Sequence, residues 1–248
     1  MEHFGYKKIK KIMIELFKNK RILVVAAHPD DELLGLGATM NKLINENNCK
    51  VRVIILGEGI TSRSDKRDTN KWKQQLTTHR KNIESARVAI GFESVGIYDF
   101  PDNRFDSVAL LDIVKTIEKE KEKFQPEIIF THHGGDLNID HQRTFEAVMT
   151  STRPLVDECV KTIITFETPS GTEWRASSDP RHFIPNLFLE VSEHNVSAKI
   201  KGIEAYEFEK RLYPHPRSPE ALITQAKRWG VVIGKQFAEA FMIIRSIS

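Results

Sequence analysis

The chain has 248 residues, of which 40% are hydrophobic, and its 37 basic and 34 acidic side chains leave a formal charge of +3. This length suits one α/β domain, and we expect a single domain over residues 1–248. The basic residues are interspersed with acids rather than gathered in one tract, which argues against a nucleic-acid partner. Two distant cysteines, Cys49 and Cys159, match neither a disulfide framework nor a CxxC metal motif, and they favour a reducing cytoplasm.

Residues 1–20 carry apolar side chains on one helical face and lysines on the other. We expect a short N-terminal helix that packs on the body of the protein, and a helix lying on a membrane surface is the alternative. Lysines interrupt this segment too often for a signal peptide, and no later apolar run is long enough to span a membrane.

Strand and helix patterns alternate over residues 21–167. Buried strands are expected at four apolar runs: 21–27, 50–56, 127–131 and 160–167. Helical spacing of apolar residues predicts helices between or after them: 36–47, 72–90, 110–117 and about 141–152. With right-handed crossovers, this order predicts an α/β fold with a Rossmann-like, mostly parallel sheet flanked by helices.

The composition changes after residue 167. Residues 168–186 are rich in Ser, Thr, Pro and Gly, and such a long loop in a compact domain is usually functional. A short strand at 186–192 and two helices, at about 194–212 and 219–245, are expected to follow. Residues 168–248 would therefore form a C-terminal loop, a strand and a helical cap.

Two polar clusters follow predicted strands. HPDDE comes after the first strand, and THHGGDLNIDH comes after EIIF. Because ligands bind at the carboxyl ends of parallel strands, both clusters should face one crevice. His28 and Asp31 can reach one ion, and Asp140-His141 can add a third ligand, which leaves a fourth position open, as in catalytic zinc sites. An ion there would lower the pKa of its bound water toward about 7, and Asp30 is then the natural general base.

Simpler interpretations exist for these residues. Asp30 or Asp31 could cap the helix that follows. His79, His182 and His194 are expected to be structural. The GLG at residues 35–37 lacks the third glycine of a dinucleotide fingerprint, and close packing of a helix on the sheet explains it better.

The segments VVAAHPDDE, GEG, HRKNIESARVAIGF, FPDNRFD and DLNIDHQ resemble the LmbE/PIG-L family of metal-dependent N-deacetylases. ETPSGTEW, FIPNLFLEVS, PHPRS and AEAF resemble sugar-modifying bacterial members of surface-polysaccharide pathways. The resemblance implies a Rossmann-like fold with zinc, or another divalent ion, held by His28, Asp31 and His141. It also implies that Asp30 is the base, and that an acetamide on an amino sugar is hydrolysed to acetate and a free amine.

The resemblance also suggests residues that contact the substrate. Arg80 matches an arginine that contacts substrate in relatives, although it could instead pair with Glu84 on the helix surface. Asp102 matches an acid that holds a sugar hydroxyl, although PDN is also a common turn sequence. Arg63, Asn103 and Arg104 are expected nearby.

Further substrate contacts are expected from arginines and from one aromatic residue. A crevice lined by arginines such as Arg63 and Arg104 would suit a phosphate or nucleotide on the substrate. Arg217, beside His215, offers a further cation for the substrate. Trp174 could stack on a sugar ring or anchor its own loop.

The chain departs from the family pattern at Asn138. Relatives carry a histidine there that polarises the carbonyl and protonates the leaving amine, and an amide cannot act as an acid. His132 and His133 should point to opposite sides of their strand, so at most one would face the metal. We expect His215, beside Arg217, to serve as acid or oxyanion donor, with His133 as second choice. A rigid connector between two helices is the alternative for His215.

The sequence therefore predicts a cytoplasmic zinc-dependent N-deacetylase. Its substrate would be an N-acetylated amino sugar that is free, nucleotide-linked or lipid-linked. The sequence is also compatible with assembly into a homo-oligomer. One alternative is a hydrolase of another amide or of an ester at the same metal site. The other is a sugar- or nucleotide-binding protein without turnover.

Overall fold

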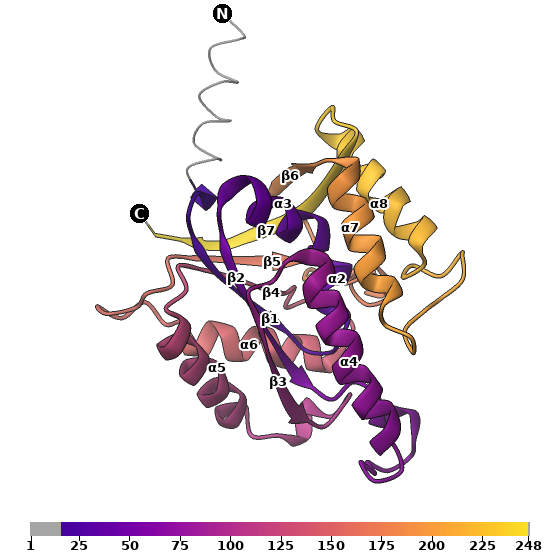
Figure 1. Ribbon diagram of the computed structural model, residues 1–248. Helices are drawn as coiled ribbons and strands as arrows, with labels where there is room; N and C mark the ends of the chain where they lie inside the picture. Colours follow the sequence, from indigo (N-terminus) through magenta and orange to yellow (C-terminus); the bar gives the residue numbers. More distant parts are fainter. Residues whose placement is uncertain (1–15, 248) are drawn as a thin grey trace, which may run out of the picture.

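A computed structural model of the protein describes residues 16–247. These residues build a seven-stranded sheet with helices on both faces (Figure 1). The helix expected over residues 1–20 lies largely outside the described residues. Within the described range, no helix is both long and apolar enough to cross a membrane.

Five strands form the parallel part of the sheet, in the order β3-β2-β1-β4-β5. Their bounds are β1 (Arg21–Ala26), β2 (Lys50–Gly57), β3 (Ser94–Phe100), β4 (Ile128–His132) and β5 (Thr162–Phe166). The predicted Rossmann-like, mostly parallel α/β fold is confirmed. The strand order reverses between β1 and β4, and ligands bind at such a switch point in open α/β sheets.

Helices cover the sheet because alternate strand residues face opposite sides. Ile22 and Val24 of β1 pack with α3, α4 and α7, whereas Leu23 and Val25 pack with α5 and α6 on the other face (Figure 1). The helices are α2 (Asp31–Leu34), α3 (Gly37–Asn47), α4 (Lys73–Ile90), α5 (Leu110–Phe124), α6 (Ile139–Ser151), α7 (Glu193–Glu204) and α8 (Pro219–Val232). Short 3-10 turns lie at Thr61–Arg63, Phe105–Ser107 and Thr172–Trp174.

The C-terminal region differs from the expected helical cap. The helix expected at 219–245 ends at Val232, and the chain continues as strand β7 (Phe237–Ser246). Gly234 has a φ of +67°, a conformation that favours glycine and interrupts the helix. β7 pairs antiparallel with β5 and with β6 (Leu187–Val191), so the last part of the chain extends the sheet. The helix expected at 194–212 is the shorter α7, and a loop replaces its second half.

Candidate metal centre and active site

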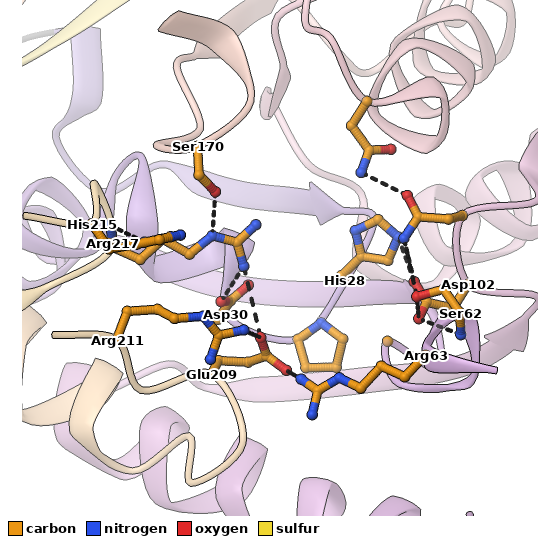
Figure 2. Close-up of a pocket in the computed structure, with 14 residues that line it drawn as sticks. His28, Asp30, Ser62, Arg63, Asp102, Ser170, Glu209, Arg211, His215 and Arg217 are labelled. Carbon is orange, nitrogen blue, oxygen red and sulfur yellow. Dashed lines mark hydrogen bonds and ion pairs between the residues drawn. The ribbon is translucent and has the colours of Figure 1, made fainter. Parts of the chain in front are cut away.

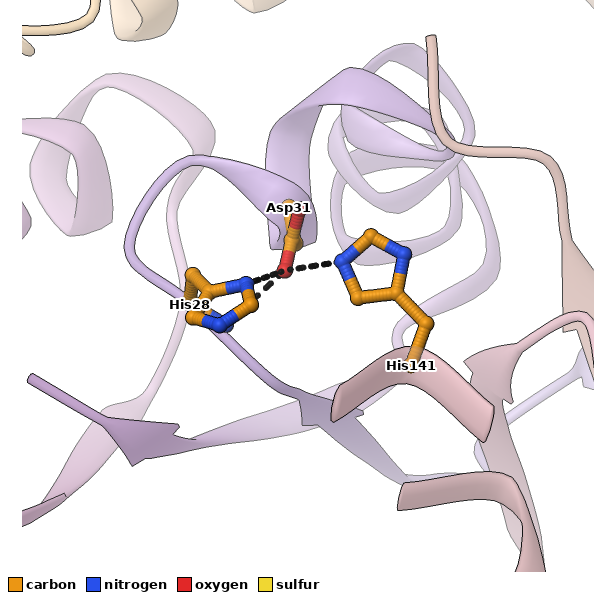
Figure 3. A group of neighbouring side chains, drawn as sticks. All are labelled: His28, Asp31 and His141. Carbon is orange, nitrogen blue, oxygen red and sulfur yellow. Dashed lines mark hydrogen bonds and ion pairs between the residues drawn. The ribbon is translucent and has the colours of Figure 1, made fainter. Parts of the chain in front are cut away.

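The carboxyl ends of β1 and β4 bring His28, Asp31 and His141 together (Figure 3). His28 follows β1, Asp31 begins α2, and His141 lies in the first turn of α6. His28 Nδ1 and His141 Nε2 each lie 3.3 Å from Asp31 Oδ2. One ligand atom from each residue lies within 4.8 Å of the others, so all three can reach one ion.

These three side chains fit a divalent ion. Asp31 Oδ1 and His141 Nε2 are buried, yet neither has a hydrogen-bond partner. Buried polar atoms are normally paired, so these atoms are available for a ligand. Two imidazole nitrogens and a carboxylate oxygen are also typical ligands of catalytic zinc.

Asp140 lies behind His28. Its Oδ2 is 2.8 Å from His28 Nε2, and its carboxylate also accepts the backbone N–H groups of Asn103 at 2.6 Å and Phe105 at 2.8 Å. His28, Asp102 and Asp140 are also close enough to hold an ion. The donors already bound to Asp140 instead indicate that it orients His28, so that Nδ1 faces Asp31. Burial alone would lower the pKa of His28, but the hydrogen bonds to Asp140 and Asp31 raise it well above its usual value.

His132 supports the cluster without offering a free nitrogen. Its ring stacks on that of His141 with the centroids 3.9 Å apart. Its Nε2 accepts the N–H of Ala27 at 2.9 Å, and its Nδ1 lies 3.0 Å from Thr168 Oγ1. Burial lowers the pKa of His132 to about 3, so this ring stays neutral.

His133 is not brought to the cluster. As the alternation of a strand requires, it points away from His132, and its Nε2 lies 2.6 Å from the carbonyl oxygen of Arg181. Its ring also packs edge-on against Phe183. The second candidate for the missing acid therefore holds the loop around residue 181.

Asp30 sits at the N-cap position of α2, but its side chain does not cap the helix. Its Oδ2 accepts a 2.9 Å hydrogen bond from Arg217 Nη1 instead. Asp30 has a φ of +103°, a strained conformation for a residue with a side chain. Glu32 stabilises it by accepting the N–H of Asp30 at 3.0 Å, and the hydroxyl of Tyr206 in turn donates to Glu32. Burial raises the pKa of Asp30 well above its usual value, and Arg217 opposes this shift.

A cavity of about 230 Å³ opens beside His28 and Asp30 (Figure 2). Loops that follow several strands contribute to its walls, together with residues 209–217 between α7 and α8. All of the lining residues except Pro29 and Gly59 have polar side chains. The cavity is lined by His28, Pro29, Asp30, Gly59, Ser62, Arg63, Asp102, Asn103, Asn138, Ser170, Glu209, Arg211, His215 and Arg217.

Three arginines of this cavity converge on Glu209 (Figure 2). The distances from the Glu209 carboxylate are 2.5 Å to Arg63, 3.3 Å to Arg211 and 3.9 Å to Arg217. The Nε of Arg217 also donates to Ser170 Oγ at 2.6 Å. The sequence did not indicate Glu209, because it lies outside every recognisable motif.

The cavity wall beside His28 is lined by Asp102, Asn103 and Asn138. Asp102 accepts the hydroxyl of Ser62 at 2.6 Å, and its Oδ1 lies 3.4 Å from His28 Nε2. Asn138 caps α6 by accepting the N–H of Asp140 at 2.8 Å, and its amide donates to Asn103 Oδ1 at 3.0 Å. Asparagine at position 138 therefore has a structural use as a helix cap.

Arg80 lies outside the main cavity. It is exposed and reaches Asp99 at 3.5 Å, and the pair considered with Glu84 does not form because Glu84 binds Arg87. Arg104 donates to the carbonyl oxygen of Asp65, beside a neighbouring cavity.

His215 lines the cavity, and Trp174 lies next to it. The two rings meet edge-on with the centroids 6.1 Å apart, and 54% of Trp174 is exposed, so part of the ring is open to a ligand. The Nδ1 of His215 accepts the backbone N–H of Arg217 at 3.1 Å.

Comparisons with known proteins agree on the fold. An uncharacterized deacetylase of Escherichia coli K12, YaiS, is 24% identical over 195 residues, which cover 77% of this chain and 92% of YaiS. N,N'-diacetylchitobiose deacetylase from Pyrococcus horikoshii superposes with a TM-score of 0.71 at 18% identity, over 99% of this chain and 93% of that chain. GalB, the 4-carboxy-2-hydroxymuconate hydratase from Pseudomonas putida KT2440, gives 0.67 at 20% identity, over 92% and 98%. Because a hydratase shares the fold, the fold alone does not fix the reaction.

The family is shown by the sequence itself. The model of the family described as PIG-L: GlcNAc-PI de-N-acetylase matches residues 23–152, just over half of the chain. This range contains His28, Asp31 and His141, the three residues of the candidate metal centre. The chain therefore belongs to the LmbE/PIG-L family of deacetylases.

Proposed function

We propose that this protein is a zinc-dependent hydrolase that removes the acetyl group from an N-acetylated amino sugar. The observation that carries the proposal is the position of Asp30. Its buried carboxylate stands next to His28, Asp31 and His141, at one end of a polar cavity. Membership of a deacetylase family favours amide hydrolysis over hydration or simple binding.

The metal ligands and Asp30 would have separate roles in the reaction. An ion held by His28, Asp31 and His141 would polarise the acetamide carbonyl and activate the attacking water. Asp30 would accept the proton of that water as it adds to the carbonyl carbon. When the C–N bond breaks, Asp30 would return the proton to the nitrogen, which yields acetate and a free amine. This route needs no acid at Asn138.

His215 suits the stabilisation of the oxyanion. Because Nδ1 accepts the N–H of Arg217, the neutral ring carries its hydrogen on Nε2. Burial, together with Arg211 and Arg217, lowers the pKa of His215, which favours this neutral form. We therefore propose that Nε2 donates a hydrogen bond to the oxyanion, and that His215 is not the proton donor.

The arginine side of the cavity suits a charged substrate. Arg63, Arg211 and Arg217 carry three positive charges, and Asp30 and Glu209 offset two of them. The cavity as a whole is balanced, because Asp102 on the wall beside His28 carries a third negative charge, but the three arginines lie together and suit an amino sugar with an anionic substituent, such as the phosphate of a nucleotide-linked sugar.

The remaining walls suit the sugar itself. Asp102 and Asn103 would hold hydroxyl groups. Trp174, beside His215, would stack on a ring at the mouth of the cavity.

Two further features belong to the proposal. Strands from residues 21–167 and from the C-terminal region share one sheet, which supports a single domain. Both cysteines are free, which supports a cytoplasmic location.

Acetate release tests the proposed function. The zinc-loaded protein would be incubated with N-acetylated amino sugars, both free and nucleotide-linked, and released acetate would be measured. We expect turnover of at least one amino sugar, and faster turnover of substrates with a phosphate. Binding of these sugars without acetate release would instead identify a binding protein.

A further inference from the structure

Asp136 lies behind His141, on the side away from Asp31. It is fully buried in the loop that follows β4. Its Oδ1 lies 3.0 Å from His141 Nδ1, whereas the other ring nitrogen of His141 faces Asp31. His141 is thus placed between two carboxylates, one on each ring nitrogen.

Asp136 is itself held by a distant part of the chain. Its Oδ2 accepts a 2.6 Å hydrogen bond from the hydroxyl of Thr172, and its Oδ1 accepts the N–H of Asn138 at 2.8 Å. Thr172 belongs to the loop after β5. A Cβ atom on Gly171 would lie 2.8 Å from Asp136 Oδ1, so the close approach of this loop requires glycine there.

The same loop also supports the second histidine of the cluster. The Oγ1 of Thr172 accepts the N–H of Thr168 at 2.7 Å, and the hydroxyl of Thr168 lies 3.0 Å from His132 Nδ1. Because His132 stacks on His141, the loop supports His141 in two ways, through Asp136 and through His132. Fixed partners of this kind determine how firmly a histidine is held for a metal.

We propose that Asp136 and Thr172 are positioning residues for His141, and that they set the affinity of the protein for its metal. Asp136 fixes the orientation of the His141 ring and makes its Nε2 a stronger metal ligand. Thr172 fixes the carboxylate of Asp136. The inference rests on the metal site of the proposed function. If Asp136 and Thr172 merely tied two loops together, removing their contact would leave metal affinity unchanged.

The experiment measures metal binding in the absence of substrate. Co²⁺ binding would be followed by its visible absorption, and Zn²⁺ affinity by competition with a chromophoric chelator. Thr172→Val removes the hydroxyl but keeps the shape, whereas Thr172→Ser keeps the hydroxyl. Thr165→Val is the matched control, because Thr165 is buried in β5 and its hydroxyl has no hydrogen-bond partner.

We expect Thr172→Val and Asp136→Asn to weaken binding by about 10-fold to 100-fold. Thr172→Ser and Thr165→Val should bind as the parent does. Thermal unfolding of each metal-free variant shows that it is folded, and Asp136→Asn provides the second test if Thr172→Val does not fold.

Some outcomes would overturn the inference alone. These are a folded Thr172→Val or Asp136→Asn that binds both metals as tightly as the parent, or an equal loss in Thr165→Val. A parent protein that binds neither metal would overturn the proposed function as well.

Discussion

Arg217 Nη1 donates a 2.9 Å hydrogen bond to Asp30 Oδ2, although 187 positions separate the two residues. Ser170 holds the same guanidinium through its Nε (Figure 2). The proposed base is therefore oriented by the segment between α7 and α8 as well as by its own turn after β1. The geometry that we propose for catalysis therefore depends on parts of the chain that lie outside the matched family segment, which ends at residue 152.

Replacement of Arg217 should therefore reduce turnover. We expect Arg217→Met to lower kcat by roughly 10-fold to 100-fold, because the Asp30 carboxylate loses the group that orients it. Ser170→Ala, which only loosens Arg217, should have a smaller effect.

Arg211→Met is the control, since Arg211 contacts Glu209 and makes no contact with Asp30. It should raise KM more than it lowers kcat. Steady-state kinetics with saturating metal would check this, and an unchanged kcat in Arg217→Met would contradict it.

Asp30→Asn should separate catalysis from metal binding. The amide cannot accept a proton from water, so we expect kcat to fall by about 100-fold or more while the metal content stays unchanged. Asp112→Asn, an exposed site on α5, is the matched control and should be fully active. Near-normal activity of Asp30→Asn with saturating metal would contradict the assigned role.

The metal ligands can be tested without any substrate. The purified protein should hold about one divalent ion per chain, and His28→Ala or His141→Ala should lose it because two ligands cannot retain it. Asp31→Asn should bind it more weakly. His194→Ala removes an exposed histidine and should keep the metal. Elemental analysis gives the metal content, and full occupancy in both ligand variants would refute the site.

The sequence predicted the parts of the molecule that have a local signal. Four of the five parallel strands, and the longer helices of residues 21–167, were predicted because their apolar residues recur at regular spacing. β3 was not among the expected buried strands, because its side chains are only partly buried. The metal cluster could be expected because both motifs follow parallel strands, whose carboxyl ends meet at one edge of the sheet. β7 was missed because AEAF reads as helix and its pairing with β5 and β6 is not visible in sequence.

The supporting residues of the site had no such signal. Glu209 binds Arg211 and Arg217 of its own loop and also Arg63, which a separate loop brings to it, and no local sequence pattern indicates this contact. Asp136 and Thr172 meet only because two loops pack against each other. Alternation predicted that His132 and His133 diverge, but it could not tell which of them faces the metal.

Acid stability should depend on His79, which is buried and packs against Phe208. Burial, with a smaller effect of Arg63, lowers the pKa of His79 to about 4 from the usual 6.5. The folded protein therefore binds fewer protons than the unfolded chain. This difference in pKa contributes to the free energy of unfolding. The contribution is fully present above the unfolded pKa and is lost as pH falls toward the folded pKa, and its upper limit is about 3 kcal/mol.

His79→Phe should remove this dependence. Urea unfolding between pH 7 and pH 4.5 would show a smaller decrease in the free energy of unfolding for His79→Phe than for the parent. The exposed His194→Ala should behave as the parent does. The same decrease in parent and His79→Phe would mean that His79 is not the group responsible.

His215 gives the prediction that separates an oxyanion donor from an acid. Its Nδ1 is occupied by the N–H of Arg217, and its pKa is lowered, so the neutral ring with hydrogen on Nε2 should be the active form. We expect His215→Ala to lose about 100-fold in kcat, the usual cost of removing one oxyanion donor. His215→Gln should recover part of it, because its amide can still donate, and His182→Ala, at an exposed loop histidine, should have no effect.

The pH dependence of kcat decides between the two roles of His215. An acid would have to be protonated, so turnover by the parent would fall as pH rises through the lowered pKa of His215. A neutral donor would keep its hydrogen on Nε2, and turnover by the parent should therefore persist at pH 8. Normal turnover in His215→Ala would instead mean that another group stabilises the oxyanion. A pH profile of the parent that falls as pH rises through the lowered pKa of His215, and loses this fall in His215→Gln, would show that His215 is the acid after all.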